Sequence, residues 1–305
     1  MTILRAFFVA TLLLGSSGNA QTPSTFPALN GEKSEARPAI LIEVSPARLY
    51  RGWPLVVTVG LRHANRRKDP AAGSAKALVI RSQGGDLGRL FRFEKVRFNK
   101  DSGRQETITL PLKQLGAAPK EVSLHPGDDA VPIARFGLPA AETATLTPAT
   151  YIIRVHLNSS IGTSAESWHG TAWDGTELQI HDEPSQLTES LACAKVLAQD
   201  EYLQGIGAKQ KAHEVLDDFL SRTPDTLAKA CWVARAKKHE RAGNPQAAGD
   251  DYCRAAKAEN EALASISLKA ENGASGPTVS SPRYALICQE FKRRFSAPAD
   301  PPSNP

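Results

Sequence analysis

The sequence lacks the motifs that mark the common enzyme classes. It contains no GxSxG nucleophile elbow, HExxH metal-binding helix, P-loop or GxGxxG dinucleotide motif. None of its seven histidines lies in such a pattern. We therefore predict a non-enzyme, with no catalytic residue, no cofactor and no metal site. A hydrolase whose Ser, His and Asp residues lie far apart in the sequence is the remaining enzymatic alternative.

Long apolar runs are absent after the first twenty residues. Arg5 precedes the apolar run 6–14, and the small residues 18–20 follow it. This three-part pattern predicts a signal peptide over residues 1–20, cleaved near Ala20-Gln21. The run is shorter than the roughly 20 residues that a membrane-spanning helix needs. We expect a periplasmic or secreted bacterial protein that does not span a membrane; a buried N-terminal helix is the alternative.

Cysteine is missing from the first part of the chain. All four cysteines lie after residue 190, namely Cys193, Cys231, Cys253 and Cys288, and no two form a CxxC pair. This spacing gives no support to a redox or zinc motif. An even count in an oxidising compartment instead predicts up to two disulfides, for which three connectivities exist.

Charge of one sign is not in large excess. The formal net charge is +5, and 41% hydrophobic with 23% charged residues is typical of a globular protein. Scattered basic residues do not form the dense patch of a nucleic-acid-binding protein, so no nucleic-acid partner is expected. One predicted strand carries Arg89, Arg92, Lys95 and Arg97. We interpret these as a solvated face, with contact to an anionic cell-surface polymer as the alternative.

A β-strand period follows a Pro- and Ser-rich stretch, residues 21–37, that we predict to be a flexible leader. Apolar residues alternate with others at Ile40, Ile42 and Val44, and again over 54–63. Similar patterns predict further strands at 76–82, 90–98, 106–112 and 173–181. Residues 116–139 fit no strand cleanly, and we predict a loop excursion there.

The segment from Leu146 to Tyr151 is a landmark within this region. A Leu five residues before a Tyr, at the start of the alternating strand 151–157, resembles the tyrosine corner of immunoglobulin-like domains. In that motif the Tyr hydroxyl bonds a backbone group a few residues upstream. Ala149 departs from the motif, which often has Gly there. The resemblance implies that residues 38–182 form a bacterial immunoglobulin-like or fibronectin-like antiparallel sandwich, without an inter-sheet disulfide.

After Pro184 the sequence takes the period of helices. Ser185 or Thr188 is a candidate N-cap for the first helix, and the glycines of 205–207 end it. Small and apolar residues then recur at spacings of four and three in two sets 36 positions apart, Ala212-Leu216-Phe219 and Ala248-Tyr252-Ala255. These sets predict two degenerate units near 190–225 and 228–262, with a further helix at 284–295.

The second unit, with Trp232 before a Gly243-Asn244-Pro245 break, resembles a tetratricopeptide repeat (TPR). The resemblance implies a domain of helical hairpins over 184–295, followed by a disordered tail at 296–305. If the hairpins stack consecutively, Cys193 and Cys231 lie on neighbouring first helices, and Cys253 reaches Cys288 on the next helix. A plain helical bundle is the alternative.

These features predict an exported scaffold or protein-interaction protein of the periplasm or cell envelope, whose helical hairpins contact an unknown protein partner. The alternative is carbohydrate binding or adhesion by the sandwich. It depends on a cluster of two aromatic rings, an imidazole and a carboxylate, which are Trp168, Trp173, His169 and Asp174. Two exposed Trp rings can stack on a glycan. The competing interpretation is that both rings pack into the edge of the sandwich.

Overall fold

The computed structural model describes residues 37–64, 77–82, 84–98, 104–159, 168–270 and 283–295. Side chains at 261–270, 292, 294 and 295 lie outside this description. The predicted signal peptide at 1–20, the leader at 21–37 except its last residue, and the tail at 296–305 also lie outside the described residues. All described residues belong to one unit of the chain, Ser34–Pro305.

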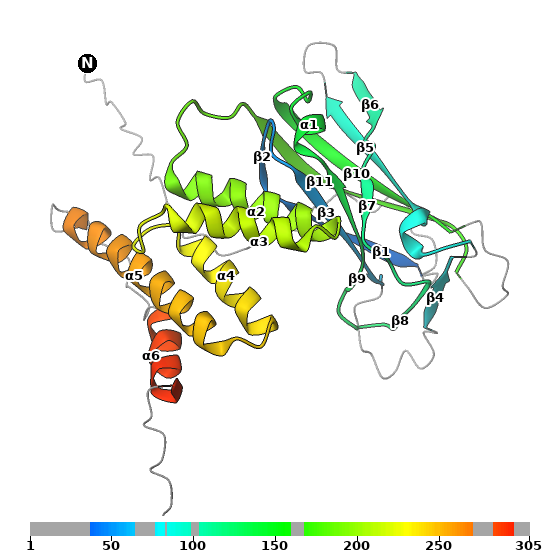
Figure 1. The fold of residues 1–305 in the computed structure, drawn as a ribbon. Coiled ribbons are helices and arrows are strands. Elements are labelled where there is room, and N and C mark those ends of the chain that lie inside the picture. The colour runs from blue at the N-terminus through cyan, green and yellow to red at the C-terminus, as the bar shows by residue number, and fades with distance from the viewer. Residues whose placement is uncertain are drawn as a thin grey trace, which may run out of the picture. The chain divides into compact units, whose positions relative to one another are not determined.

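Strands make up the N-terminal part of this unit and helices the C-terminal part (Figure 1). The strands are β1 (Pro38–Ser45), β2 (Arg48–Tyr50), β3 (Leu55–His63), β4 (Leu78–Arg81), β5 (Phe91–Phe98), β6 (Gln105–Thr109), β7 (Lys113–Leu115), β8 (Glu121–Leu124), β9 (Val131–Leu138), β10 (Ala149–Asn158) and β11 (Thr171–His181). A single-turn helix, α1 (Ala140–Thr143), lies among them. The helical region consists of α2 (Glu189–Gly205), α3 (Lys209–Ser221), α4 (Lys229–Arg241), α5 (Pro245–Ala270) and α6 (Arg283–Phe295).

The described strands form two larger sheets and one strand pair. The first sheet has the order β1-β3-β9-β7, the second has the order β2-β11-β10-β5-β6, and β4 pairs with β8. Neighbouring strands are antiparallel, apart from β2 and β11, which are parallel. The prediction of antiparallel sheets followed by helices is therefore confirmed at this level.

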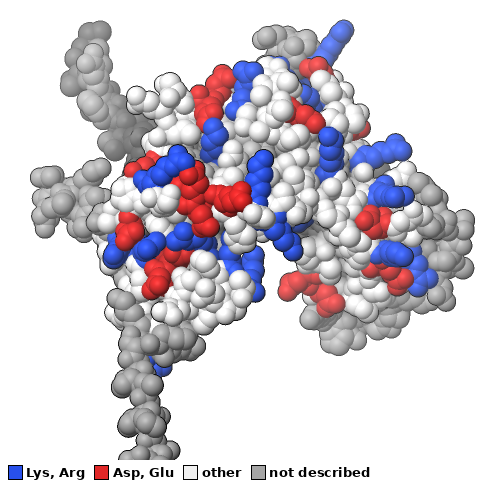
Figure 2. Space-filling model, in the orientation of Figure 1, with Lys and Arg blue, Asp and Glu red and all other residues white. Residues whose placement is uncertain are grey.

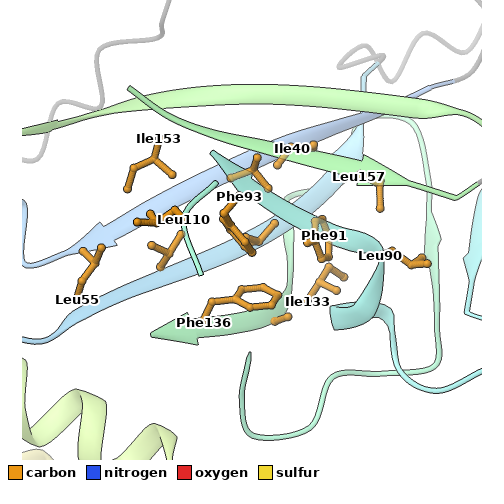
Figure 3. Close-up of a cluster of buried hydrophobic side chains, with 14 of the residues drawn as sticks. Ile40, Leu55, Leu90, Phe91, Phe93, Leu110, Ile133, Phe136, Ile153 and Leu157 are labelled. Atoms are coloured by element: carbon orange, nitrogen blue, oxygen red, sulfur yellow. The ribbon is translucent and has the colours of Figure 1, made fainter. Parts of the chain in front are cut away.

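Both larger sheets contribute to one hydrophobic core (Figure 3). Strand β10 shows how the sequence produces it, because Ile153, Val155 and Leu157 are fully buried while the residues between them are half-buried. Phe136 of the first sheet meets Phe93 of the second, with ring centroids 4.5 Å apart. Contacts of this kind hold the two sheets face to face.

The predicted tyrosine hydrogen bond is present where β10 begins. The Tyr151 hydroxyl donates to the Thr147 carbonyl oxygen at 3.0 Å, and Leu146 is buried nearby. The bond satisfies the polar end of a ring that is otherwise in the core. It also fixes the chain that enters β10 from α1.

The prediction of a loop excursion over residues 116–139 was wrong. This segment contains β8 and β9, and β9 lies between β3 and β7 in the first sheet. In β9, the residues from Ile133 to Leu138 are buried on both faces of the strand, except for half-buried Arg135. The sequence there consequently lacks the alternation of apolar and polar residues by which a strand is predicted. Pro132, close to a register shift against β3, also weakens the strand signal.

Helix α2 explains why the first sheet is buried on both faces. It packs against β3 and β9, and Val56 is buried on the side of β3 that faces away from the core. The approach is close at Gly137 of β9. A Cβ atom there would lie 2.8 Å from both Leu115 Cδ1 and Tyr202 Cε2 of α2.

Two carboxylates add polar contacts between the strands and α2. Glu201 accepts hydrogen bonds from Ser45 Oγ at 2.6 Å and from Arg135 Nη2 at 2.8 Å. Glu183, just before the helix, accepts from the Trp53 indole at 3.1 Å and from the Lys195 amine at 2.7 Å. Glu201 therefore connects α2 to strands β1 and β9, and Glu183 connects α2 to Trp53 in the β region.

The helices form a second hydrophobic core around Trp232, Leu216 and Tyr252. Helix α2 belongs to both cores, since Leu191 and Ala194 pack on the strands while other α2 residues pack on the helices. Its N-cap is Thr188, one of the two predicted candidates, whose hydroxyl oxygen accepts from the Leu191 amide. Helix α5 runs to Ala270, beyond the predicted end of the second unit.

Two disulfides connect the helices in the predicted pairing. Cys193 of α2 is bonded to Cys231 of α4, with Cα atoms 5.8 Å apart. Cys253 of α5 is bonded to Cys288 of α6, with Cα atoms 4.7 Å apart. One bond therefore joins α2 to α4 and the other joins α5 to α6, and both indicate an oxidising, exported environment.

Candidate binding face

Trp173 is the strongly exposed tryptophan of the described residues, with 60% of its surface accessible. It lies on β11, whose side chains alternate between the two faces of the second sheet. Leu178 and Ile180 point into the core, so Trp173, at an odd-numbered position, points to the opposite, outer face. No packing contact with the core explains this large apolar ring.

Side chains of the neighbouring strands lie beside Trp173 on the outer face. His156 of β10 is directly opposite it in the strand register, and the Arg154 guanidinium carbon lies 5.0 Å from the Trp173 ring centroid. On β5, Glu94 is opposite Arg154 and Arg92 is opposite His156. We call these five residues, Arg92, Glu94, Arg154, His156 and Trp173, the Trp173 face.

Positive groups outnumber negative ones on the Trp173 face. The Glu94 carboxylate serves two partners, with Oε2 3.1 Å from His156 Nε2 and 3.9 Å from Arg154 Nη1. Arg154 Nε is buried and has no acceptor within the described part of the chain. Exposed Arg92 likewise forms no ion pair with any described residue. Within the described residues, the Arg154 guanidinium therefore has one distant ion-pair partner and the Arg92 guanidinium has none.

Trp168 lies elsewhere and is half-buried against the β core. Its backbone amide donates to the Val79 carbonyl at 2.7 Å, and its carbonyl accepts from Ser159 Oγ. These bonds fix the start of the turn into β11. They direct the indole inward, so the two tryptophans do not form a paired aromatic surface.

Asp174 follows Trp173 but points to the other face of the sheet. It lies opposite core-facing Val155 in the register and is half-buried. Burial raises the pKa of its carboxyl group, although the Gly175 amide, which donates to it at 2.8 Å, opposes that effect. Exposed His169 has its Nδ1 3.3 Å from the Ser159 carbonyl oxygen. The four residues named from the sequence are thus not brought together.

Sequence reasoning missed the partners that Trp173 does have. Arg154 and His156 stand in the alternating segment that follows Tyr151, and their polar positions signal an outward direction. Their place beside Trp173 depends on the β10–β11 register, which no sequence spacing indicates. The alternation of side chains along a strand is the one sequence signal that places Trp173 and Asp174 on opposite faces of the sheet.

The charged residues buried among the helices are paired with one another. Arg235 of α4 donates to both Asp251 carboxylate oxygens at 2.8 Å, and these hydrogen bonds are the main cause of the raised pKa of Arg235. The Arg235 and Arg254 guanidinium groups lie 4.8 and 4.7 Å from the Trp232 ring centroid. This cluster holds α4 against α5. Figure 2 shows acidic and basic side chains interspersed over the helical region.

No group of three or more His, Cys, Asp or Glu side chains that could hold a metal ion occurs among the described residues. At His125 the chain forms a turn in which the Asp128 amide donates to the His125 carbonyl at 3.3 Å. Gly127 has a φ of +78° in that turn, a conformation that favours glycine. None of the described helices has the length and hydropathy needed to cross a bilayer.

No protein-family model matches the chain, and no curated protein matches it. Among solved structures, it is similar to the sporulation control protein Spo0M of Bacillus subtilis, with 14% identity, 55% of each chain covered and a TM-score of 0.27. It is also similar to AvmM, which catalyzes macrocyclization in alchivemycin A biosynthesis, with 13% identity, 49% of this chain and 92% of that chain covered, and a TM-score of 0.25.

A third similarity is to AggA, the major subunit of aggregative adherence fimbriae type I of Escherichia coli. The identity is 10%, the match covers 48% of this chain and 96% of that chain, and the TM-score is 0.23. The chain spans about half the length of Spo0M. All three TM-scores are below 0.5, so these similarities support no conclusion about function.

Proposed function

We propose that the chain is an exported, non-catalytic interaction protein of the bacterial periplasm or envelope. Its β region would be an immunoglobulin-like sandwich, and its helical region would consist of TPR-like hairpins. The Tyr151 hydrogen bond to Thr147 supports the first assignment. The α2–α3 and α4–α5 hairpins, together with two disulfides in the order that stacked hairpins require, support the second.

One observation carries the choice of binding surface: Trp173 is 60% exposed on the sheet face that α2 leaves uncovered. On the first sheet, α2 packs over β3 and β9 and covers part of the outer face. Tryptophan and arginine are the residue types that contribute most to binding at interfaces. The Trp173 face presents both, at 5.0 Å from each other. We therefore propose that this face holds the partner.

The helical region has a scaffold role in this proposal. The disulfides and the membership of α2 in both cores fix the helices as a rigid body, which lowers the ordering cost of any contact. A concave protein-binding surface on the hairpins remains the second candidate. It is supported by exposed Leu286 on α6, an apolar side chain with 59% of its surface accessible.

Variants that change one exposed side chain test these surfaces separately. The tagged full chain, Trp173→Ala and Leu286→Ala would be exported from the same host, crosslinked in living cells and purified. We expect Trp173→Ala to lose the envelope adducts that Leu286→Ala retains. Loss in Leu286→Ala alone would favour the hairpin surface, and identical adduct patterns in all three proteins would contradict the proposal. Thermal unfolding checks that each variant is folded.

A further inference from the structure

We infer that the ligand of the Trp173 face is a sugar polymer that bears carboxylate groups on its rings, that is, a uronate-containing polysaccharide. The inference rests on the proposed function, since it names the partner class of that same face. It depends on three properties of the face: an exposed flat ring, underused guanidinium groups beside it, and little other exposed apolar surface.

The exposed ring provides a stacking platform. Trp173 stands on a regular strand, and the backbone of β11 pairs with β10 along its full length, so the platform is fixed to a rigid element. Gly175, the next residue on the same face, adds no side chain beside the ring, over which the Arg154 guanidinium lies at 5.0 Å from the centroid. A Cβ atom there would lie 2.9 Å from Ile152 Cγ2. The apolar C–H face of a pyranose can pack on such a ring while its hydroxyl groups remain in water.

The guanidinium groups determine the charge of the ligand. Arg154 has only the 3.9 Å contact of its Nη1 with Glu94 as an ion pair within the described residues, and 25% of its side-chain surface is accessible. Arg92, opposite His156 on the neighbouring strand β5, adds an exposed guanidinium that has no ion pair within the described residues. A guanidinium group binds a carboxylate through two parallel N–H donors. In a uronate the carboxylate is attached to the stacked ring itself, which places it close to the groups that flank Trp173.

The polarity of the remaining face favours a hydrated ligand over a protein. On the same sheet face, the apolar residues Val96 and Ile152 are fully buried and half-buried, and the exposed Phe98 lies six residues along β5 from Arg92, away from Trp173. A protein partner normally buries a larger apolar centre than a single ring. The Trp173 face has instead one ring surrounded by charged and polar groups. This composition matches a polymer whose units each offer one apolar patch and one anion.

Binding of polygalacturonate oligomers to the full chain tests the inference by calorimetry at low salt. Fully methyl-esterified oligomers are the matched neutral ligand, polyglutamate is the anion without sugar rings, and polyphosphate is the phosphate-bearing anion. We expect binding of polygalacturonate alone. Trp173→Ala and Arg154→Gln should each weaken it about tenfold or more, the effect of losing a contact to a charged group. Arg97→Gln, which changes an exposed arginine on the core-facing side of β5, should leave it unchanged.

Several results would overturn the inference. Equal binding of the methyl ester would show that charge is irrelevant, and equal binding of polyglutamate or polyphosphate would show that the sugar or its carboxylate is irrelevant. An equal loss in Arg97→Gln would indicate unspecific attraction. If no glycan binds while the crosslinked adducts still depend on Trp173, the partner is a protein. The ligand class is then wrong and the proposed binding face stands.

Discussion

A single methyl group added at Gly137 should weaken the whole described unit. The new Cβ would lie 2.8 Å from Leu115 and from the Tyr202 ring, closer than carbon atoms approach without displacement. Gly137 is paired with β3 on one side and β7 on the other, so its backbone has little freedom to move away. Overpacking of this kind costs about 1–3 kcal/mol. With a urea dependence of about 2 kcal/mol per molar, the unfolding midpoint should fall by roughly 0.5–1.5 M.

Pulsed hydrogen exchange with mass spectrometry across a urea series measures this midpoint separately for strand and helix peptides. Because α2 belongs to both cores, we expect Gly137→Ala to lower both midpoints together. Gly84→Ala is the matched control, since a Cβ atom there meets nothing within 4 Å. Its free energy of unfolding should rise by no more than about 0.4–1 kcal/mol, and its midpoints should not fall. A Gly137→Ala midpoint equal to that of the control, or a shift in the strand peptides alone, would refute the coupling.

Two further predictions concern charged side chains. Asp200→Ala should lower the free energy of unfolding in urea by about 3–5 kcal/mol, because it leaves Lys238, whose side chain is 9% exposed, without its buried partner. Asp218→Ala, the control, breaks an exposed ion pair and should cost under about 0.5 kcal/mol. Equal losses in the two variants would contradict the argument. The hydrogen bond from Lys195 holds the pKa of Glu183 below its ordinary 4.5, so its stabilising effect is complete above that pH and disappears as the pH falls through the lowered value. The stability difference between the wild type and Glu183→Gln should therefore shrink in unfolding experiments below pH 4.5, and a difference independent of pH would exclude this role.

The sequence predicted what depends on local spacing. Thr188 caps α2 because its side chain needs only the amide three residues later, and Tyr151 finds Thr147 within the same turn. The sequence left the disulfide connectivity open, and the observed bonds, between cysteines 38 and 35 residues apart, match the pairing expected if the hairpins stack. These features require no knowledge of how distant strands align.

Features that depend on long-range contacts could not be predicted in the same way. Strand β9 lost its alternation because α2 covers the face that would otherwise be polar. The neighbours of Trp173 come from strands β5 and β10, and their alignment is set by the whole second sheet. A cluster chosen from adjacent residues, Trp168 to Asp174, consequently included side chains that point in different directions.

Near Pro184 the sequence pattern therefore changes from that of strands to that of helices, but the packing of side chains continues across this boundary. Glu183 binds Trp53 on one side and Lys195 on the other, and α2 contributes apolar residues to both cores. Without the helices, Val56 and its neighbours on the first sheet would form an exposed apolar patch, which favours aggregation. The helical region thus covers part of the outer face of the first sheet, whereas the proposed binding face lies on the second sheet. For this reason, deleting the chain from the boundary onward would remove the helices and also disturb the β region that carries the Trp173 face. Single surface variants, in contrast, test the Trp173 face and the helical surface separately.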